Sequence, residues 1–178
     1  MLRAANYTAL AEQNKRIDRA LIGAAISFGV DIEINDEPGY APLNNCEELA
    51  MLAKEAYSKI FPKETCSVYG NIGSGVTDMG DLSMLMPVIH PYIGGAIGKG
   101  HGEDYYVKDP ERAVVMSAKW QLATLRLLLE GGCERAKNII KSYKPEFSSK
   151  EDFLRMQDTL KRSGDRVEYG SDGSVKIK

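Results

Sequence analysis

The chain has 178 residues, of which 43% are hydrophobic and 27% are charged, and its formal net charge is −2. The apolar fraction is enough for a hydrophobic core, and the charged fraction excludes a membrane protein by composition. There is no run of basic residues and no apolar stretch of signal-peptide length at the N-terminus. We therefore expect a cytoplasmic protein that binds neither nucleic acid nor a membrane. The three cysteines lack C-x-x-C spacing, so reduced thiols are expected, with a disulfide or a zinc–thiolate site as the alternative.

The first segment is predicted to be a helix followed by a strand. Over residues 7–28, apolar side chains recur on one helical face, and Asn6 or Thr8 is suited to cap the start while Gly29 ends it. Residues 30–35 then alternate strictly between apolar and polar side chains. Such alternation predicts a strand with one buried face, as in an antiparallel sheet.

The middle of the chain is predicted to continue with a helix over residues 45–61, which Pro62 stops. A short strand is expected over 66–70. Two further strands, over 84–90 and 93–97, show little polar alternation, which is typical of a sheet covered on both faces.

The last third is predicted to begin with a long helix over residues 110–130. Asp109 is a suitable N-cap for this helix, and Gly131-Gly132 end it. The remaining expected elements are two short helices near 133–143 and 149–162, and two short strands at 167–169 and 175–177. The two strands either form a small hairpin around a Ser-Asp-Gly turn or are frayed.

The change of pattern near residue 40, from a one-sided strand to a two-sided sheet, predicts a change of domain. We expect the end of a small domain at 1–38, a larger α/β domain at 39–145, and a helix and tail of unknown role at 146–178. One helix and one strand are too few to fold alone. We therefore expect upstream residues or a partner to complete the first domain.

Both histidines are candidate site residues. His101 lies between two glycines after a predicted strand, and neutral imidazole is a favoured zinc ligand; a loop histidine in a glycine-rich turn is the alternative. His90 falls at the end of a predicted core strand, where open α/β sheets place ligand-binding residues. A structural histidine is the alternative there.

Two acidic segments are weaker candidates. The loop over residues 75–81 offers backbone N–H groups to an anion such as a substrate carboxylate, and Asp78 is suited to orient a ligand. Glu47-Glu48 resembles a base and metal-ligand pair, but its place in the first turn of a predicted helix favours interaction with the helix dipole. No H-x-D, H-E-x-x-H, G-x-S-x-G or phosphate-loop motif occurs in the chain.

Three segments taken together carry a family resemblance. Residues 12–34 followed by 39–43 look like the last helix and strand of a lid domain and the return to a catalytic domain. Residues 76–83, running on to 87–91, are similar to a S-T-D-x-G-[DN]-x-S…P-x-[IV]-H pattern, and His101 follows where that pattern places a final metal-binding histidine. In this order they resemble the C-terminal part of the zinc-dependent amidohydrolase and peptidase family of aminoacylases, carboxypeptidases and dipeptidases. The branch most similar contains aminobenzoyl-glutamate hydrolase and the β-alanyl-lysine dipeptidases.

The resemblance covers roughly residues 1–131 and implies an α/β fold. In it, part of a catalytic mixed sheet with flanking helices follows the last helix and strand of an α+β lid that forms a homodimer. It also implies two zinc ions per full-length protein, with manganese or cobalt as substitutes, which polarise an amide and activate water. His101 would ligate one metal, and Thr77, Asp78, Gly80 and His90 would bind substrate or support the metal ligands.

The resemblance implies that no catalytic residue lies in this chain, because the family's general-base glutamate and remaining ligands lie upstream. We therefore expect a fragment of a hydrolase for N-acyl amino acids or dipeptides that is inactive alone. Whether the chain itself is an enzyme is left open. The alternative is a non-enzymatic dimerisation or complementing module derived from such a hydrolase.

Overall fold

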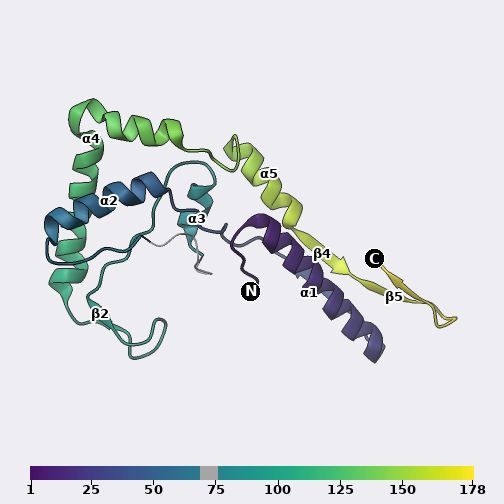
Figure 1. Ribbon diagram of the computed structural model, residues 1–178. Coiled ribbons are helices and arrows are strands. Elements are labelled where there is room, and N and C mark those ends of the chain that lie inside the picture. Colours follow the sequence, from purple (N-terminus) through teal and green to yellow (C-terminus); the bar gives the residue numbers. More distant parts are fainter. Residues whose placement is uncertain (69–75) are drawn as a thin grey trace. The chain divides into compact units, whose positions relative to one another are not determined.

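The computed structural model describes residues 1–68 and 76–178, which form helices and small two-stranded antiparallel sheets (Figure 1). The expected α/β class is confirmed at this level. The chain forms two compact units: the described parts of the first are residues 1–43, 76–85 and 146–178, and those of the second are 44–68 and 86–145. No helix in these ranges is both long and apolar enough to cross a bilayer.

The first unit begins with α1 (Tyr7–Phe28), whose ends are set by local chemistry. The side chain of Asn6 accepts a hydrogen bond from the backbone N–H of Ala9 at 2.8 Å, which satisfies one of the free donors of the first turn. Gly29 closes the helix with a φ of 64°, in the left-handed region that glycine adopts without strain. The predicted helix and both of its ends are confirmed.

Strand β1 (Glu33–Asp36) buries Ile34 and leaves the residues on either side exposed, so the predicted one-sided strand is confirmed over 33–35. Residues 30–32 of the prediction lie outside the strand, and Val30 is exposed. It pairs antiparallel with β4 (Arg162–Asp165), far along the chain. In Figure 1, β4 runs beside α1. Arg162 joins the two, because its guanidinium lies 2.8 Å from the carboxylate of Asp18 on α1.

The C-terminal elements also belong to the first unit. Helix α5 (Lys150–Leu160) is capped by Ser149, whose hydroxyl accepts a hydrogen bond from the N–H of Asp152 at 3.1 Å. Strands β5 (Val167–Tyr169) and β6 (Val175–Ile177) pair antiparallel. The hairpin alternative is therefore confirmed.

The second unit is built on α2 (Glu47–Ile60), which packs against α4 (Ser117–Ser142). Apolar side chains of both helices form its core, and Trp120 is the largest of them. The indole N–H of Trp120 donates to the carbonyl of Ala53 at 2.7 Å, so the ring is buried with its one polar group satisfied.

The long predicted helix is divided in two ways. A single π-helical stretch, η1 (Glu111–Met116), precedes α4, and Asp109 caps it by accepting from the N–H of Arg112 at 3.0 Å. Within α4 the helical geometry is interrupted over Glu130–Cys133, where the last three residues have positive φ. The predicted stop at Gly131-Gly132 and the second helix after it are thus confirmed.

The strand predicted over residues 84–90 is wrong. Pro87 has no N–H to give a sheet, and the backbone beside it bonds to the start of α2 instead: the carbonyl of Val88 accepts from the N–H of Cys46 at 2.8 Å. Residues 84–86 form a turn after α3, and residues 87–90 are irregular without a strand partner.

Only the end of the strand predicted over 93–97 is observed, as β2 (Ala96–Ile97), which pairs with β3 (Tyr106–Val107). Residues 66–68 are not a strand, and residues 69 and 70 of that predicted strand lie outside the described residues. Within the described part of the second unit, β2 and β3 are the only strands. A mixed catalytic sheet therefore stays a prediction.

Candidate functional site

His101 lies at the tip of the β2–β3 hairpin in the second unit and is exposed to solvent. The turn is closed by a hydrogen bond from the N–H of Gly102 to the carbonyl of Lys99 at 2.7 Å. His101 has a φ of 64°, in the left-handed region. Left-handed backbone costs a residue with a side chain about 1–2 kcal/mol, so this conformation is held by the turn.

The acidic residues next to His101 are partly used by the turn itself. Asp104 accepts hydrogen bonds from the N–H of Lys99 at both carboxylate oxygens, at 3.2 and 3.3 Å. The carboxylate of Asp104 thus fixes the loop that presents the imidazole. Glu103 is exposed beside it.

His90 is half-buried in the same unit and is held at its backbone. Its N–H donates to the side-chain oxygen of Asn45 at 3.0 Å, which holds the backbone at His90 beside the start of α2. The imidazole contacts the ring of Tyr92 edge-on, with centroids 5.1 Å apart. The sequence predicted His90 at the end of a core strand; the structure places it on an irregular segment that is not a strand.

The loop predicted around Asp78 is instead the short helix α3 (Asp78–Ser83) of the first unit. Thr77 caps it, because its hydroxyl accepts from the N–H of Met79 at 3.2 Å, and Asp78 is exposed in the first turn. The described residues 76–80 are therefore a helix start rather than an open loop; Gly75 lies outside the described part of the chain.

Gly80 is buried on α3 against the backbone of residue 41. A Cβ at this position would lie 2.9 Å from the carbonyl carbon of Ala41 and closer still to its oxygen. The N–H of Ala41 also donates to the carboxylate of Asp81 at 2.7 Å. Only glycine permits this close approach, so Gly80 has a packing role whatever else it does.

The structure brings Thr77, Asp78 and Gly80 together on one short helix of the first unit, and places His90 and His101 in the second. Among residues 1–68 and 76–178, no group of three or more His, Cys, Asp or Glu side chains is placed to hold a metal ion.

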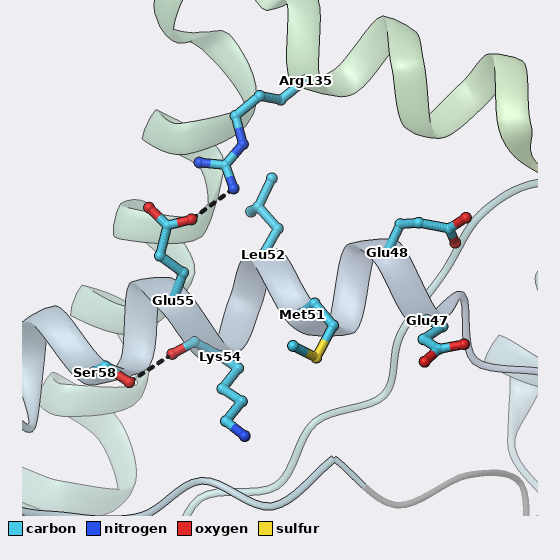
Figure 2. Close-up of a pocket in the computed structure, with 8 residues that line it drawn as sticks. All are labelled: Glu47, Glu48, Met51, Leu52, Lys54, Glu55, Ser58 and Arg135. Carbon is cyan, nitrogen blue, oxygen red and sulfur yellow. Dashed lines mark hydrogen bonds and ion pairs between the residues drawn. The ribbon is translucent and has the colours of Figure 1, made fainter.

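An open groove of about 740 Å³ lies along α2 in the second unit (Figure 2). Its lining combines acidic, basic and apolar side chains: Glu47, Glu48, Met51, Leu52, Lys54, Glu55, Ser58 and Arg135. Glu55 pairs with Arg135 at 2.6 Å and with Lys59 at 2.9 Å. These hydrogen bonds, from Arg135 first and Lys59 second, lower the pKa of the Glu55 carboxyl to about 2.

We assign no catalytic role to this groove, because the carboxylate of Glu55 is engaged in ion pairs with Arg135 and Lys59. Glu47 and Glu48 do lie in the first turn of α2, where their charge favours the helix N-terminus as predicted. Glu48 also accepts a hydrogen bond from the hydroxyl of Ser142 at 3.5 Å, which links the start of α2 to the end of α4.

A second electrostatic cluster of the second unit was not predicted from the sequence. Arg112 forms a forked ion pair with Glu64, and the hydroxyl of Tyr57 donates to the same carboxylate at 2.7 Å. The guanidinium lies 5.4 Å from the ring centroid of Phe61, a cation–π contact. The hydrogen bonds, chiefly from Arg112, lower the pKa of Glu64 to about 2. Arg112 and Glu64 are 48 residues apart in sequence, so no local pattern predicts this ion pair.

Comparison of the chain with family models, with curated proteins and with solved structures finds no match.

Proposed function

We propose that the chain contributes a metal-binding histidine, His101, to a zinc-dependent amidohydrolase or dipeptidase, and that it has no activity without the polypeptide that supplies the other ligands. The proposal starts from the motif resemblance around Asp78, His90 and His101. The bound metals of such an enzyme polarise the scissile amide and activate water.

One observation carries the proposal: His101 is exposed, flanked by two glycines, and held in a left-handed conformation at a hairpin tip. A packing role does not explain an exposed side chain on strained backbone, whereas presenting an imidazole to a ligand does. The hydrogen bonds of Asp104 to the turn keep the loop in this shape. The imidazole is a fitting zinc ligand by its chemistry.

The chain supplies too few ligands for a catalytic zinc on its own. Such a site usually needs three protein ligands, and the part of the chain that the structure describes holds no group of that size. The residues present fit one ligand position and not a whole site. In this proposal the remaining ligands and the general base are supplied by another polypeptide segment or by a partner.

The other residues of the motif would act around this centre. His90, with its backbone fixed by Asn45, would orient the substrate. Thr77, Asp78 and Gly80 would support the substrate or the metal ligands through α3. Homodimerisation through residues 1–38 belongs to the same proposal and applies to the complete enzyme, in which the rest of the lid is present.

Hydrolysis assays test whether the chain is inactive alone. The isolated protein is incubated with aminobenzoyl-glutamate and several dipeptides in the presence of zinc or manganese. No turnover above the metal blank is expected. Chelator-sensitive turnover by the isolated chain would contradict the claim that ligands are missing.

The role of His101 is tested directly on the isolated chain by titrating Zn²⁺ while following the imidazole signals of both histidines by NMR. Weak binding is expected to move the His101 signals and to disappear in His101→Ala. His90→Ala is the matched control and should leave the zinc response of His101 in place. An equal response in His101→Ala would overturn the assignment.

A non-enzymatic dimerisation or complementing module is the second candidate function. It is favoured by the exposed apolar side chains on α1, where Ile17 and Leu21 are 42% and 46% exposed and Phe28 more so. Co-expression with a family hydrolase subunit that lacks this region tests it: restored folding without restored activity favours the module.

A further inference from the structure

The regular part of α4 before its interruption carries apolar side chains on two opposite faces. The inner face holds Trp120 and Leu127, each 5% exposed, in the core formed with α2. The outer face holds Leu122, Leu125 and Leu129, which are 65%, 49% and 55% exposed. A helix that is apolar on both faces is characteristic of a buried helix.

The outer residues have the spacing of a helix–helix seam. Ala118, Leu122, Leu125 and Leu129, here called the leucine stripe, follow one another at intervals of four, three and four residues, and all are exposed. This is the repeat of the a and d positions in a coiled coil, which place apolar side chains along the line where two helices meet. Trp120 and Leu127 fall on the side of the helix that faces away from this line.

We propose that the leucine stripe is a self-association surface, on which a second copy of this chain docks with its own α4 in parallel. The proposal goes beyond the metal site and does not depend on it. It also differs from dimerisation through α1, since it places the contact on the second unit.

The charges beside the stripe favour a parallel second copy. The flanking basic residues are Lys119 and Arg126, and the latter already pairs with Glu130 at 2.6 Å on the same helix. In a parallel pair, Arg126 of one copy lies beside the neutral Gln121 of the other. An antiparallel pair would instead place Lys119 beside Arg126 and oppose two positive charges.

The size of the surface predicts weak association. Val114 and Val115, which precede the stripe, are 63% and 46% exposed. Burying an aliphatic side chain removes on the order of 100 Å² of apolar surface from water, so these valines and the exposed part of the stripe offer roughly 300 Å² per copy. A standard specific interface buries about 800 Å² per partner. We therefore expect reversible, concentration-dependent association in the micromolar range or weaker.

Sedimentation velocity on the full chain over a wide range of concentration tests the proposal. Wild type should show a rising average mass with concentration. Leu122→Glu/Leu125→Glu should remain monomeric at concentrations where wild type associates. Ile17→Glu/Leu21→Glu makes the same charge change on α1 and should still associate. Circular dichroism and the fluorescence of Trp120 establish that both variants are folded.

Cross-linking gives the orientation and an independent check. In a background with Cys66→Ser and Cys133→Ser, a short bis-maleimide should link Ala118→Cys to itself in a parallel pair. An antiparallel pair would link Leu122→Cys but not Ala118→Cys and would overturn the parallel arrangement. Monomeric wild type at every concentration, or unchanged association of the Leu122→Glu/Leu125→Glu variant, would overturn the surface itself. Loss of association in Ile17→Glu/Leu21→Glu alone would also overturn the leucine stripe as the association surface.

Discussion

Replacing Gly80 by alanine is expected to destabilise the first unit strongly. The added Cβ would lie 2.9 Å from the carbonyl carbon of Ala41 and nearer to its oxygen, so α3 and the segment at residue 41 must move apart. Overpacking of this kind typically costs about 1–3 kcal/mol. The separation also strains the 2.7 Å hydrogen bond between the Asp81 carboxylate and the N–H of Ala41.

The size of the destabilisation by Gly80→Ala follows from adding its opposing effects. Losing a hydrogen bond to a charged group costs about 1.5–3 kcal/mol. Alanine regains about 1 kcal/mol relative to glycine as a helix former. The net expectation for Gly80→Ala is a loss of about 2–5 kcal/mol in the free energy of unfolding, a large share of the about 5–15 kcal/mol of a typical domain.

Urea denaturation and hydrogen-exchange mass spectrometry measure this effect. The fluorescence of Trp120 reports the second unit, so exchange in peptides from α3 and α5 is needed to follow the first. Gly23→Ala is the matched control: it lies inside α1 with nothing within 4 Å of the added Cβ, and it should stabilise by up to about 1 kcal/mol. If Gly80→Ala behaves like Gly23→Ala, the close approach of α3 to residue 41 is not as described.

Three further substitutions test other local features. Because the pKa of Glu64 is lowered to about 2 from 4.5, its contribution to stability is present above pH 4.5 and is lost as the pH falls toward 2. Glu64→Gln should therefore lower the urea midpoint at pH 7 and make the midpoint decrease less between pH 4.5 and pH 2. If the variant's urea midpoint depends on acid pH as that of wild type does, the ion pair with Arg112 contributes nothing to stability. Cys133→Gly should raise the free energy of unfolding by about 0.5–1 kcal/mol, because glycine removes the strain of the left-handed backbone and this gain exceeds the added entropy of the unfolded chain. A variant less stable than wild type in chemical denaturation would contradict this expectation. Thr77→Ala should cost about 1 kcal/mol through loss of the α3 cap while Thr77→Ser keeps it, and equal stability of the two by thermal melting would refute the cap.

The helices were predictable because capping residues next to each helix determine where it begins and ends. Asn6, Gly29, Asp109 and Ser149 each sit where capping chemistry requires them, and each end was found within a few residues of its expected position. The break at Gly131-Gly132 follows from the same logic, because two glycines permit the left-handed backbone that interrupts α4.

The strands were less predictable because their partners are remote. The alternation over residues 30–35 predicted a one-sided strand but contained no information on β4, which lies more than a hundred residues away. Over 84–90, apolar composition predicted a strand, yet Pro87 and the bond from Cys46 to Val88 direct the backbone elsewhere. Burial alone does not distinguish an extended segment that packs on a helix from a strand.

The outer face of α4 shows a further limit of periodicity. Leucines occur on several faces of this helix, so the pattern predicted a helix correctly without showing which leucines lie inside. The position of α2 decides it, by covering Trp120 and Leu127 and leaving Leu122 and Leu125 exposed. Long-range packing, rather than local sequence, separates core from surface here.

The motif residues differ in how far the fold alone explains them. Thr77 is accounted for by its cap, and Gly80 by the close approach of residue 41, so either would be retained in a protein with no catalytic history. Cys133 is strained, but it lies at the kink that joins the two parts of α4. His101 combines strain with an exposed side chain, which fills no core and caps no helix. The functional proposal therefore depends on His101 more than on the longer motif that led to it, and zinc titration of His101→Ala tests it more severely than any substitution on α3.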